Sequence, residues 1–139
     1  MSEIPSDRRV QVFLLKVAAR CNIDCTYCYE YRGADTSWRT NPSLMSMDVV
    51  ASAGHRIFEH ASTHGLRKVH VILHGGEPLL AGRPFFEQAI RHLRSICSPE
   101  VTVQFGIQTN GVLLDVEWLN LFREHSVSVG ISIDGPRAA

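Results

Sequence analysis

The sequence lacks three features that would place it in common protein classes. It has no excess of either charge, since 14 Lys and Arg residues balance 14 Asp and Glu residues in a chain of 139 residues. We therefore expect neither a nucleic acid nor an anionic membrane surface as a partner. No apolar run approaches the roughly 18 residues of a membrane span, and residues 1–9 lack the apolar segment of a signal peptide. We expect a cytoplasmic protein.

Cysteine is also scarce, with four residues, which is too sparse for a secreted disulfide scaffold. Cys21, Cys25 and Cys28 fall within eight residues, and clustered thiols without a signal peptide favour metal over disulfide. An iron–sulfur cube normally takes four Cys ligands, so these three would leave one iron open to another ligand. A zinc site completed by a histidine such as His74, or three free thiols, are the alternatives. Cys97 lies on the apolar stripe of a predicted helix and is expected in the core.

Apolar runs and helical periodicities alternate along the chain. The pattern predicts a buried strand at 10–17 and then a long polar loop at 18–43. Three helices are expected from Ser46 or Asp48 to Gly65, from Pro84 to Cys97 and from Asp115 to Glu124, and three further strands at 69–73, 101–108 and 127–133. Such alternation predicts a parallel sheet with right-handed crossovers.

Apart from Ile72, polar or small residues occupy every second position of the last three strands. His74, Gln108 and Ser132 share this polar face, whereas Val103 and Ile131 belong to the apolar face that the helices should cover. A doubly wound sheet would be apolar on both faces, and a packed barrel lumen would be apolar as well. The pattern thus indicates a barrel-like sheet whose polar inner face holds a ligand. A solvated face of a one-sided α/β layer is the alternative.

Short polar motifs follow the ends of all four strands. The first is the cysteine motif, and the others are His74-Gly75-Gly76-Glu77-Pro78, Gln108-Thr109-Asn110-Gly111 and Ser132-Ile133-Asp134-Gly135-Pro136. Each of the last three is also ordinary turn chemistry by itself. Their common position at the C-terminal rim, where parallel sheets bind ligands, favours one site built from all four. Paired glycines would let the backbone approach a ligand closely, and Glu77 adds an acceptor for an ammonium group.

Together these motifs resemble a known superfamily. The segments Cys21-x-x-x-Cys25-x-Tyr27-Cys28, Gly75-Gly76-Glu77-Pro78, Thr109-Asn110-Gly111 and Ser132-Ile133-Asp134-Gly135 are similar to those of radical S-adenosylmethionine (radical SAM) enzymes, from about Phe13 to Pro136. Within that superfamily they resemble peptide- and protein-modifying enzymes with a SPASM extension, including the anaerobic sulfatase-maturating enzymes. Ala34-Asp35-Thr36-Ser37-Trp38 and His74-Gly75-Gly76-Glu77-Pro78-Leu79-Leu80 are similar to segments of the maturases that form cyclophane crosslinks in FxSxx-type ribosomal peptides.

The resemblance implies a [4Fe–4S] cluster and SAM as cofactors. Cys21, Cys25 and Cys28 would ligate three irons, and SAM would chelate the fourth. The implied SAM contacts are Tyr27 against the adenine, Gly75, Gly76 and Glu77 at the methionyl amino group, and Ser132 and Asn110 at the ribose or carboxylate end. The reduced cluster would cleave SAM to a 5′-deoxyadenosyl radical, which abstracts hydrogen from a peptide or protein substrate. A flavodoxin- or ferredoxin-like protein would donate the electron. No catalytic acid or base is identified, and His70 and His74 are expected to line the lumen.

The resemblance also implies the fold. The core of this superfamily is a (β/α)6 partial TIM barrel, and residues 1–139 would form its N-terminal part, with four parallel strands and three helices on the outer face. SAM contacts from later strands and the cysteines of auxiliary clusters would then be absent, and we expect the isolated chain to be inactive. A zinc-binding module and an inert truncated fragment are the alternative interpretations.

Overall fold

The computed structural model describes residues 9–135. Residues 1–8 of the polar N-terminal segment, and Pro136 of the last motif, lie outside the described residues. None of the helices in this part of the chain is long and apolar enough to cross a membrane.

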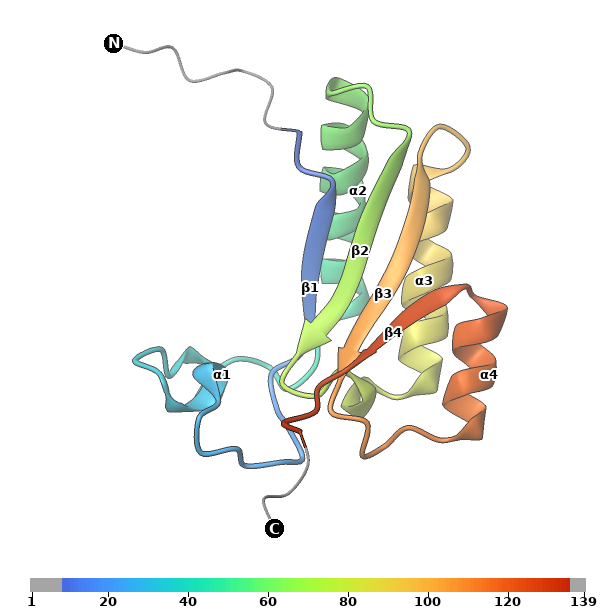
Figure 1. Ribbon diagram of the computed structural model, residues 1–139. Coiled ribbons are helices and arrows are strands. Elements are labelled where there is room, and N and C mark those ends of the chain that lie inside the picture. The colour runs from blue at the N-terminus through green and yellow to red at the C-terminus, as the bar shows by residue number, and fades with distance from the viewer. Residues whose placement is uncertain (1–8, 136–139) are drawn as a thin grey trace.

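Four strands form one sheet in the order in which they occur in the chain (Figure 1). They are β1 (Val12–Ala18), β2 (Lys68–Gly75), β3 (Thr102–Thr109) and β4 (Val127–Ile131). Each neighbouring pair is parallel. The C-terminal ends of all four strands therefore lie at one edge of the sheet, as the alternating pattern predicted.

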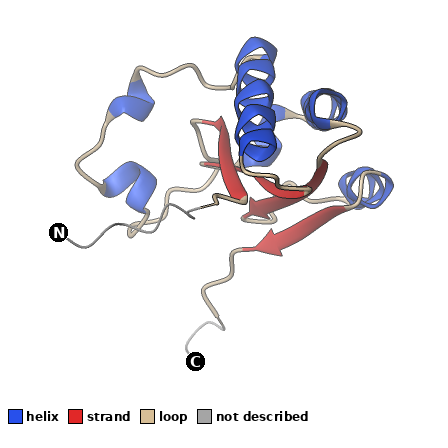
Figure 2. Cartoon of the chain, turned by 90° about the horizontal axis from the view of Figure 1, so that it is seen from above, coloured by secondary structure: helices blue, strands red, loops and turns tan. Residues whose placement is uncertain are grey.

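Three helices cover one face of this sheet and leave the other face open (Figure 2). They are α2 (Met47–Thr63), α3 (Arg83–Cys97) and α4 (Val116–Glu124). Val71 and Leu73 of β2 and Phe86 of α3 are fully buried between the two layers. The buried positions alternate along β2 and β3, so each strand presents one apolar and one more polar face. This confirms the predicted α/β class, with parallel strands and the helices on the outer face.

The helix starts follow from local capping chemistry. The Ser46 side chain accepts a hydrogen bond from Val49 N at 3.3 Å, and the Asp115 side chain accepts one from Trp118 N at 2.8 Å. Both N-caps satisfy a backbone N–H that has no partner within the helix. Gly65, two residues beyond α2, has a φ of +63°, which is the left-handed conformation that glycine favours. These helix boundaries were predicted from the sequence.

The long polar loop contains two short helices that were not predicted. They are α1 (Tyr29–Arg32) and the 3₁₀ helix η1 (Ser37–Arg39). A further 3₁₀ helix, η2 (Pro78–Ala81), follows β2. The loop returns to the sheet edge through an antiparallel bridge between Ala18 and Leu44.

The prediction that Ile131 packs under a helix was wrong, because its side chain is 47% exposed. The neighbouring helix, α4, is short and packs through Trp118, whose ring lies 5.1 Å from that of Phe86. Val127 at the start of β4 is buried in the same core, whereas the end of the strand is exposed. Val103 on β3 is buried, as predicted.

Candidate functional site

The ends of β2, β3 and β4 and the three clustered cysteines surround one cavity of about 240 Å³, called here the cysteine cavity. Its lining includes Cys21, Cys25, Tyr27, Cys28, His74, Gly75, Gly76, Gln108, Thr109, Asn110, Ser132 and Asp134. The four motifs that the sequence placed at one rim are thus neighbours in space. Of the expected site residues, Glu77 alone does not line the cavity.

The cysteine loop, residues 19–28 between β1 and α1, ends in a tight turn that leads into α1. Cys28 N donates to Cys25 O at 3.3 Å, and Cys28 O accepts from Arg32 N at 2.9 Å. All three thiols of the loop are free and partly exposed, whereas Cys97 is free and buried in the core. The Asn110 side-chain amide lies 3.7 Å from Cys21 Sγ.

The donor set fits a centre with several irons. Within residues 9–135, no three His, Cys, Asp or Glu side chains form a group that could hold a metal ion. The three thiols nevertheless line one cavity. A cluster of several irons suits such an arrangement, because each thiolate ligates a different iron. The Asn110 amide beside Cys21 provides a donor to the sulfur, and such hydrogen bonds tune the potential of a cluster.

The two glycines at the end of β2 let the cysteine loop lie directly against the sheet. Gly76 N donates to Ala18 O at 2.9 Å, and Glu77 N donates to Arg20 O at 2.9 Å. A Cβ added at Gly75 would overlap the Ala18 carbonyl oxygen, and one at Gly76 would overlap Tyr31 Oη. The sequence predicted that these glycines expose the backbone to a ligand. Their packing against residues 18–20, and of Gly76 against Tyr31, is a further role that the sequence did not reveal.

The carboxylate of Glu77 is buried between β2 and β3 rather than turned to the cavity. Its Oε1 accepts from Leu79 N at 3.0 Å and from Thr109 Oγ1 at 2.8 Å. Its Oε2 accepts from Asn110 N at 2.8 Å. The carboxylate expected at an amino group is thus already occupied by three donors of the chain itself.

The polar face of the sheet continues into the cysteine cavity. Gln108 Nε2 donates to Ser132 Oγ at 2.9 Å, which joins the ends of β3 and β4. His74 lines the same cavity from β2. The prediction that His74, Gln108 and Ser132 converge near the cysteine loop is confirmed.

Two tyrosines border the cysteine cavity in different ways. The exposed Tyr27 donates its hydroxyl hydrogen to Asp134 Oδ2, which joins the cysteine loop to the segment after β4. This hydrogen bond raises the pKa of Tyr27 to about 12. Burial raises the pKa of Tyr31 to about 12, and its hydroxyl has no hydrogen-bond partner. Asp134 and Tyr31 were not predicted as site residues. The signal for Asp134 was its place in the motif Ser132-Ile133-Asp134-Gly135-Pro136.

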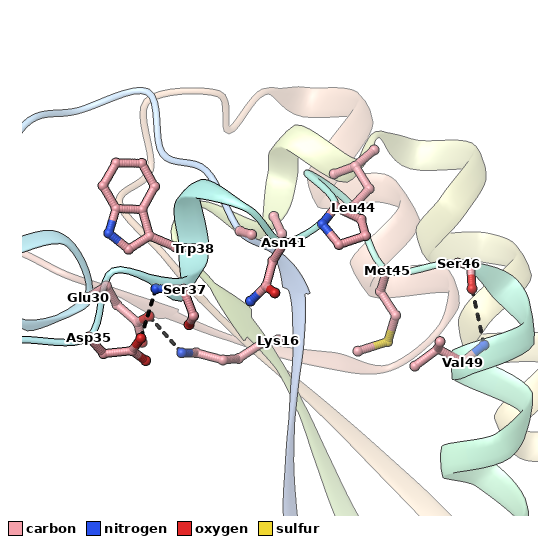
Figure 3. A pocket seen from close by; sticks show the side chains of 13 residues that line it. Lys16, Glu30, Asp35, Ser37, Trp38, Asn41, Leu44, Met45, Ser46 and Val49 are labelled. Atoms are coloured by element: carbon pink, nitrogen blue, oxygen red, sulfur yellow. Dashed lines mark hydrogen bonds and ion pairs between the residues drawn. The ribbon is translucent and has the colours of Figure 1, made fainter.

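A second cavity, of about 410 Å³, lies between the end of β1 and residues 35–49 (Figure 3). Trp38, Leu44 and Met45 supply apolar walls, and an ion pair of 2.7 Å joins Lys16 Nζ to Glu30 Oε2 at its border. The Trp38 ring contacts Tyr31 edge-on at 4.9 Å. Trp38 thus packs against Tyr31 of α1, the helix that follows the cysteine loop.

The family model for the radical SAM superfamily matches residues 15–138. The serine-type anaerobic sulfatase-maturating enzyme of Klebsiella aerogenes is 32% identical over 127 residues, which are 91% of this chain and 30% of that enzyme. The cysteine-type anaerobic sulfatase-maturating enzyme of Clostridium perfringens (strain 13 / Type A) is 33% identical over 125 residues, which are 89% of this chain and 33% of that enzyme.

A solved structure described as native anSMEcpe with bound AdoMet and Kp18Cys peptide superimposes with a TM-score of 0.74 at 31% identity. The match covers 90% of this chain and 32% of that chain. This chain therefore spans about a third of the length of the proteins to which it is similar.

Proposed function

This chain belongs to the radical SAM superfamily, and from that premise we propose that it binds a [4Fe–4S] cluster and SAM in the cysteine cavity. Cys21, Cys25 and Cys28 would ligate the cluster. The observation that carries the proposal is that these thiols and the ends of β2, β3 and β4 line one cavity. Ligands of parallel α/β sheets bind at this edge.

The other residues of the cavity would hold SAM. We propose that the strand end at Gly75, Gly76 and Glu77 receives the methionyl amino group through its backbone. Ser132 and Asn110 would contact the ribose or carboxylate end, and Tyr27 the adenine. Tyr27 and Asp134 both line the cavity and are joined by a hydrogen bond, so an adenine between them would have to displace that contact.

When bound and reduced, a cluster held by Cys21, Cys25 and Cys28 would supply the electron for reductive cleavage of SAM to methionine and a 5′-deoxyadenosyl radical. The chain's own residues bind, orient and shield the reacting groups, which is the usual division of work between protein and cofactor. The turn from Cys25 to Cys28 and the hydrogen bond from Gly76 N to Ala18 O would hold the thiols near the strand ends.

We propose that the substrate is a ribosomal peptide or a protein, modified after translation. The sulfatase-maturating relatives and the peptide bound in the neighbouring structure support this class of substrate. The segment Ala34 to Trp38 resembles a segment of cyclophane-forming maturases. It contacts α1, which follows the cysteine loop, through the rings of Trp38 and Tyr31 and lines the second cavity. A flavodoxin- or ferredoxin-like protein would donate the electron.

Electron paramagnetic resonance of the reconstituted, reduced protein tests this proposal. We expect a signal of a reduced [4Fe–4S] cluster whose shape changes when millimolar SAM is added, because SAM would ligate the open iron. A signal that SAM leaves unchanged would contradict SAM binding at the cluster. Loss of the SAM response in Ser132→Ala, with the cluster signal retained, would support the proposed contact at β4.

A further inference from the structure

Glu77 is the one acidic side chain among residues 9–135 that is completely buried, with 0% exposure. A buried carboxylate is costly unless hydrogen bonds or opposite charges compensate it. Here three donors do so, namely Leu79 N, Thr109 Oγ1 and Asn110 N. The Thr109 hydroxyl accepts from Gly111 N at 3.1 Å, which leaves its hydrogen for Glu77. All three contacts require an acceptor, and an ionised carboxylate is an acceptor only.

These contacts join parts of the chain that are far apart in sequence. Leu79 lies in η2, which directly follows Glu77, whereas Thr109 and Asn110 lie at the end of β3, more than 30 residues later. From Thr109 the connection continues to β4, because Thr109 O accepts from Ser132 N at 2.9 Å.

The connection also reaches the cysteine loop. Asn110 N is held by Glu77, and the side-chain amide of Asn110 donates to Asn22 Oδ1 at 2.8 Å and lies 3.7 Å from Cys21 Sγ. The Asn110 side-chain oxygen accepts from Val112 N at 3.0 Å, which fixes the orientation of the amide. One carboxylate therefore connects, through its partners, two groups expected to contact SAM and one expected cluster ligand.

We propose that Glu77 is a positioning residue, whose buried carboxylate fixes Asn110 against Cys21 and Ser132 at the end of β4. Its effect on SAM is exerted through these residues and not through a contact between the carboxylate and the methionyl ammonium. This inference rests on the proposed binding of SAM in the cysteine cavity.

Glu77→Gln is the variant that changes the side chain least. A glutamine side chain has the same size, but it offers one acceptor atom and one N–H₂ group. In either orientation an N–H₂ group meets a backbone N–H, and turning the oxygen toward Leu79 and Thr109 leaves Asn110 N without its acceptor. We expect faster hydrogen exchange of the backbone amides at 110–112 in the variant. An unmade buried hydrogen bond of this kind should also weaken SAM binding about 10-fold.

A SAM analogue without the α-amino group separates positioning from direct contact. If Glu77 acts by positioning, Glu77→Gln weakens the binding of SAM and of the deamino analogue by the same factor. If the carboxylate contacts the ammonium, the variant weakens SAM but leaves the analogue unaffected. The binding of both ligands is measured from the cluster's resonance signal in the reconstituted protein. The comparison is a double-mutant cycle with one change in the ligand.

A second variant and a control keep the test decisive. Thr109→Val removes one donor to Glu77. It should weaken the binding of SAM and of the deamino analogue by the same factor, which should be smaller than the factor for Glu77→Gln. Glu87→Gln removes an exposed carboxylate of α3, paired with Arg91 at 2.6 Å, and should change neither binding nor exchange. A penalty confined to SAM, or unchanged exchange at 110–112, overturns the inference. If the unmodified protein fails to bind SAM, the proposed function itself is wrong.

Discussion

At the residue scale, cysteines of one chain have two different environments. Cys97 is buried in the core among the apolar residues of α3, and burial raises the pKa of its thiol. Cys21, Cys25 and Cys28 are partly exposed and border the cysteine cavity. Since the thiolate is the metal-binding form, position decides which of the four are suited to ligate iron.

Replacing Cys21, Cys25 or Cys28 by Ala should abolish iron incorporation, because three thiolates are already fewer than a cube normally takes. Cys97→Ala is the matched control and should keep the iron while losing about 1 kcal/mol of stability. Iron analysis and thermal unfolding of the four variants provide the measurement. Iron retained in Cys21→Ala and lost in Cys97→Ala would refute the ligand assignment.

Gly76→Ala should damage the site through packing alone. The added Cβ would overlap Tyr31 Oη and the carbonyl oxygen of Arg20, so the cysteine loop must move. We expect a loss of at least about 1–3 kcal/mol of unfolding free energy, as for overpacked cores, together with reduced iron incorporation. Denaturant unfolding and iron analysis measure the two effects.

Gly106→Ala is the control for this substitution. A Cβ at Gly106 would meet its nearest neighbours, Ile72 Cγ1 and Ser128 O, at 3.8 Å, which is ordinary contact. Its stability should stay equal or rise by up to about 1 kcal/mol. Equal behaviour of the two alanine variants would show that the glycine contact with the cysteine loop is unimportant.

The sequence predicted those residues whose placement depends on local pattern. His74, Gln108 and Ser132 follow from the two-residue period of a strand, which assigns each to a face. Two of the three partners of Glu77, Thr109 and Asn110, could not be predicted, because they lie 32 and 33 residues away and depend on how β2 and β3 align. The contact between Tyr27 and Asp134 could not be predicted either, because the two residues are separated by 107 residues.

At the element scale, the longer helices were predictable and the shorter ones were not. The N-terminal ends of α2 and α4 follow from Ser46 and Asp115, which cap these helices with their own side chains. By contrast, α1 and η1 have four and three residues, too few to show a helical period. The two short helices instead contact each other through the edge-on contact of Tyr31 with Trp38.

Ser46→Ala should lower stability by about 1 kcal/mol, the usual cost of losing an N-cap side chain. The hydrogen bond from Val49 N at 3.3 Å would be lost, and the exposed helix start would gain no replacement within the chain. Ser52→Ala, at an exposed position inside the same helix, should be neutral or slightly stabilising because alanine has the higher helix propensity. The midpoints of denaturant unfolding compare the two. An effect of Ser52→Ala as large as that of Ser46→Ala would contradict the capping role.

At the scale of the whole molecule, the parallel sheet places its four C-terminal strand ends at one edge. The helices cover one face of the sheet, and the other face is open (Figure 2). In the described residues β4 pairs with β3 alone, and Val129 and Ile131 on it are partly exposed. The matched relatives are about three times as long as this chain. Within the described residues, the cysteine cavity is bordered by the cysteine loop and the ends of β2, β3 and β4.

The 139-residue chain by itself should bind SAM weakly and modify no peptide. A radical intermediate requires exclusion of water, and an open sheet edge favours association with other chains. Formation of 5′-deoxyadenosine by the reconstituted chain with a strong reductant is the measurement. Robust formation that depends on added peptide would show that four strands suffice.

The account depends most directly on what the cysteine loop binds. Analysis of iron, acid-labile sulfide and zinc after anaerobic reconstitution answers this in one measurement. We predict about four irons and four sulfides per chain, as in a [4Fe–4S] cluster, with broad absorption in the blue. A colourless protein with about one zinc per chain and no sulfide would contradict the account.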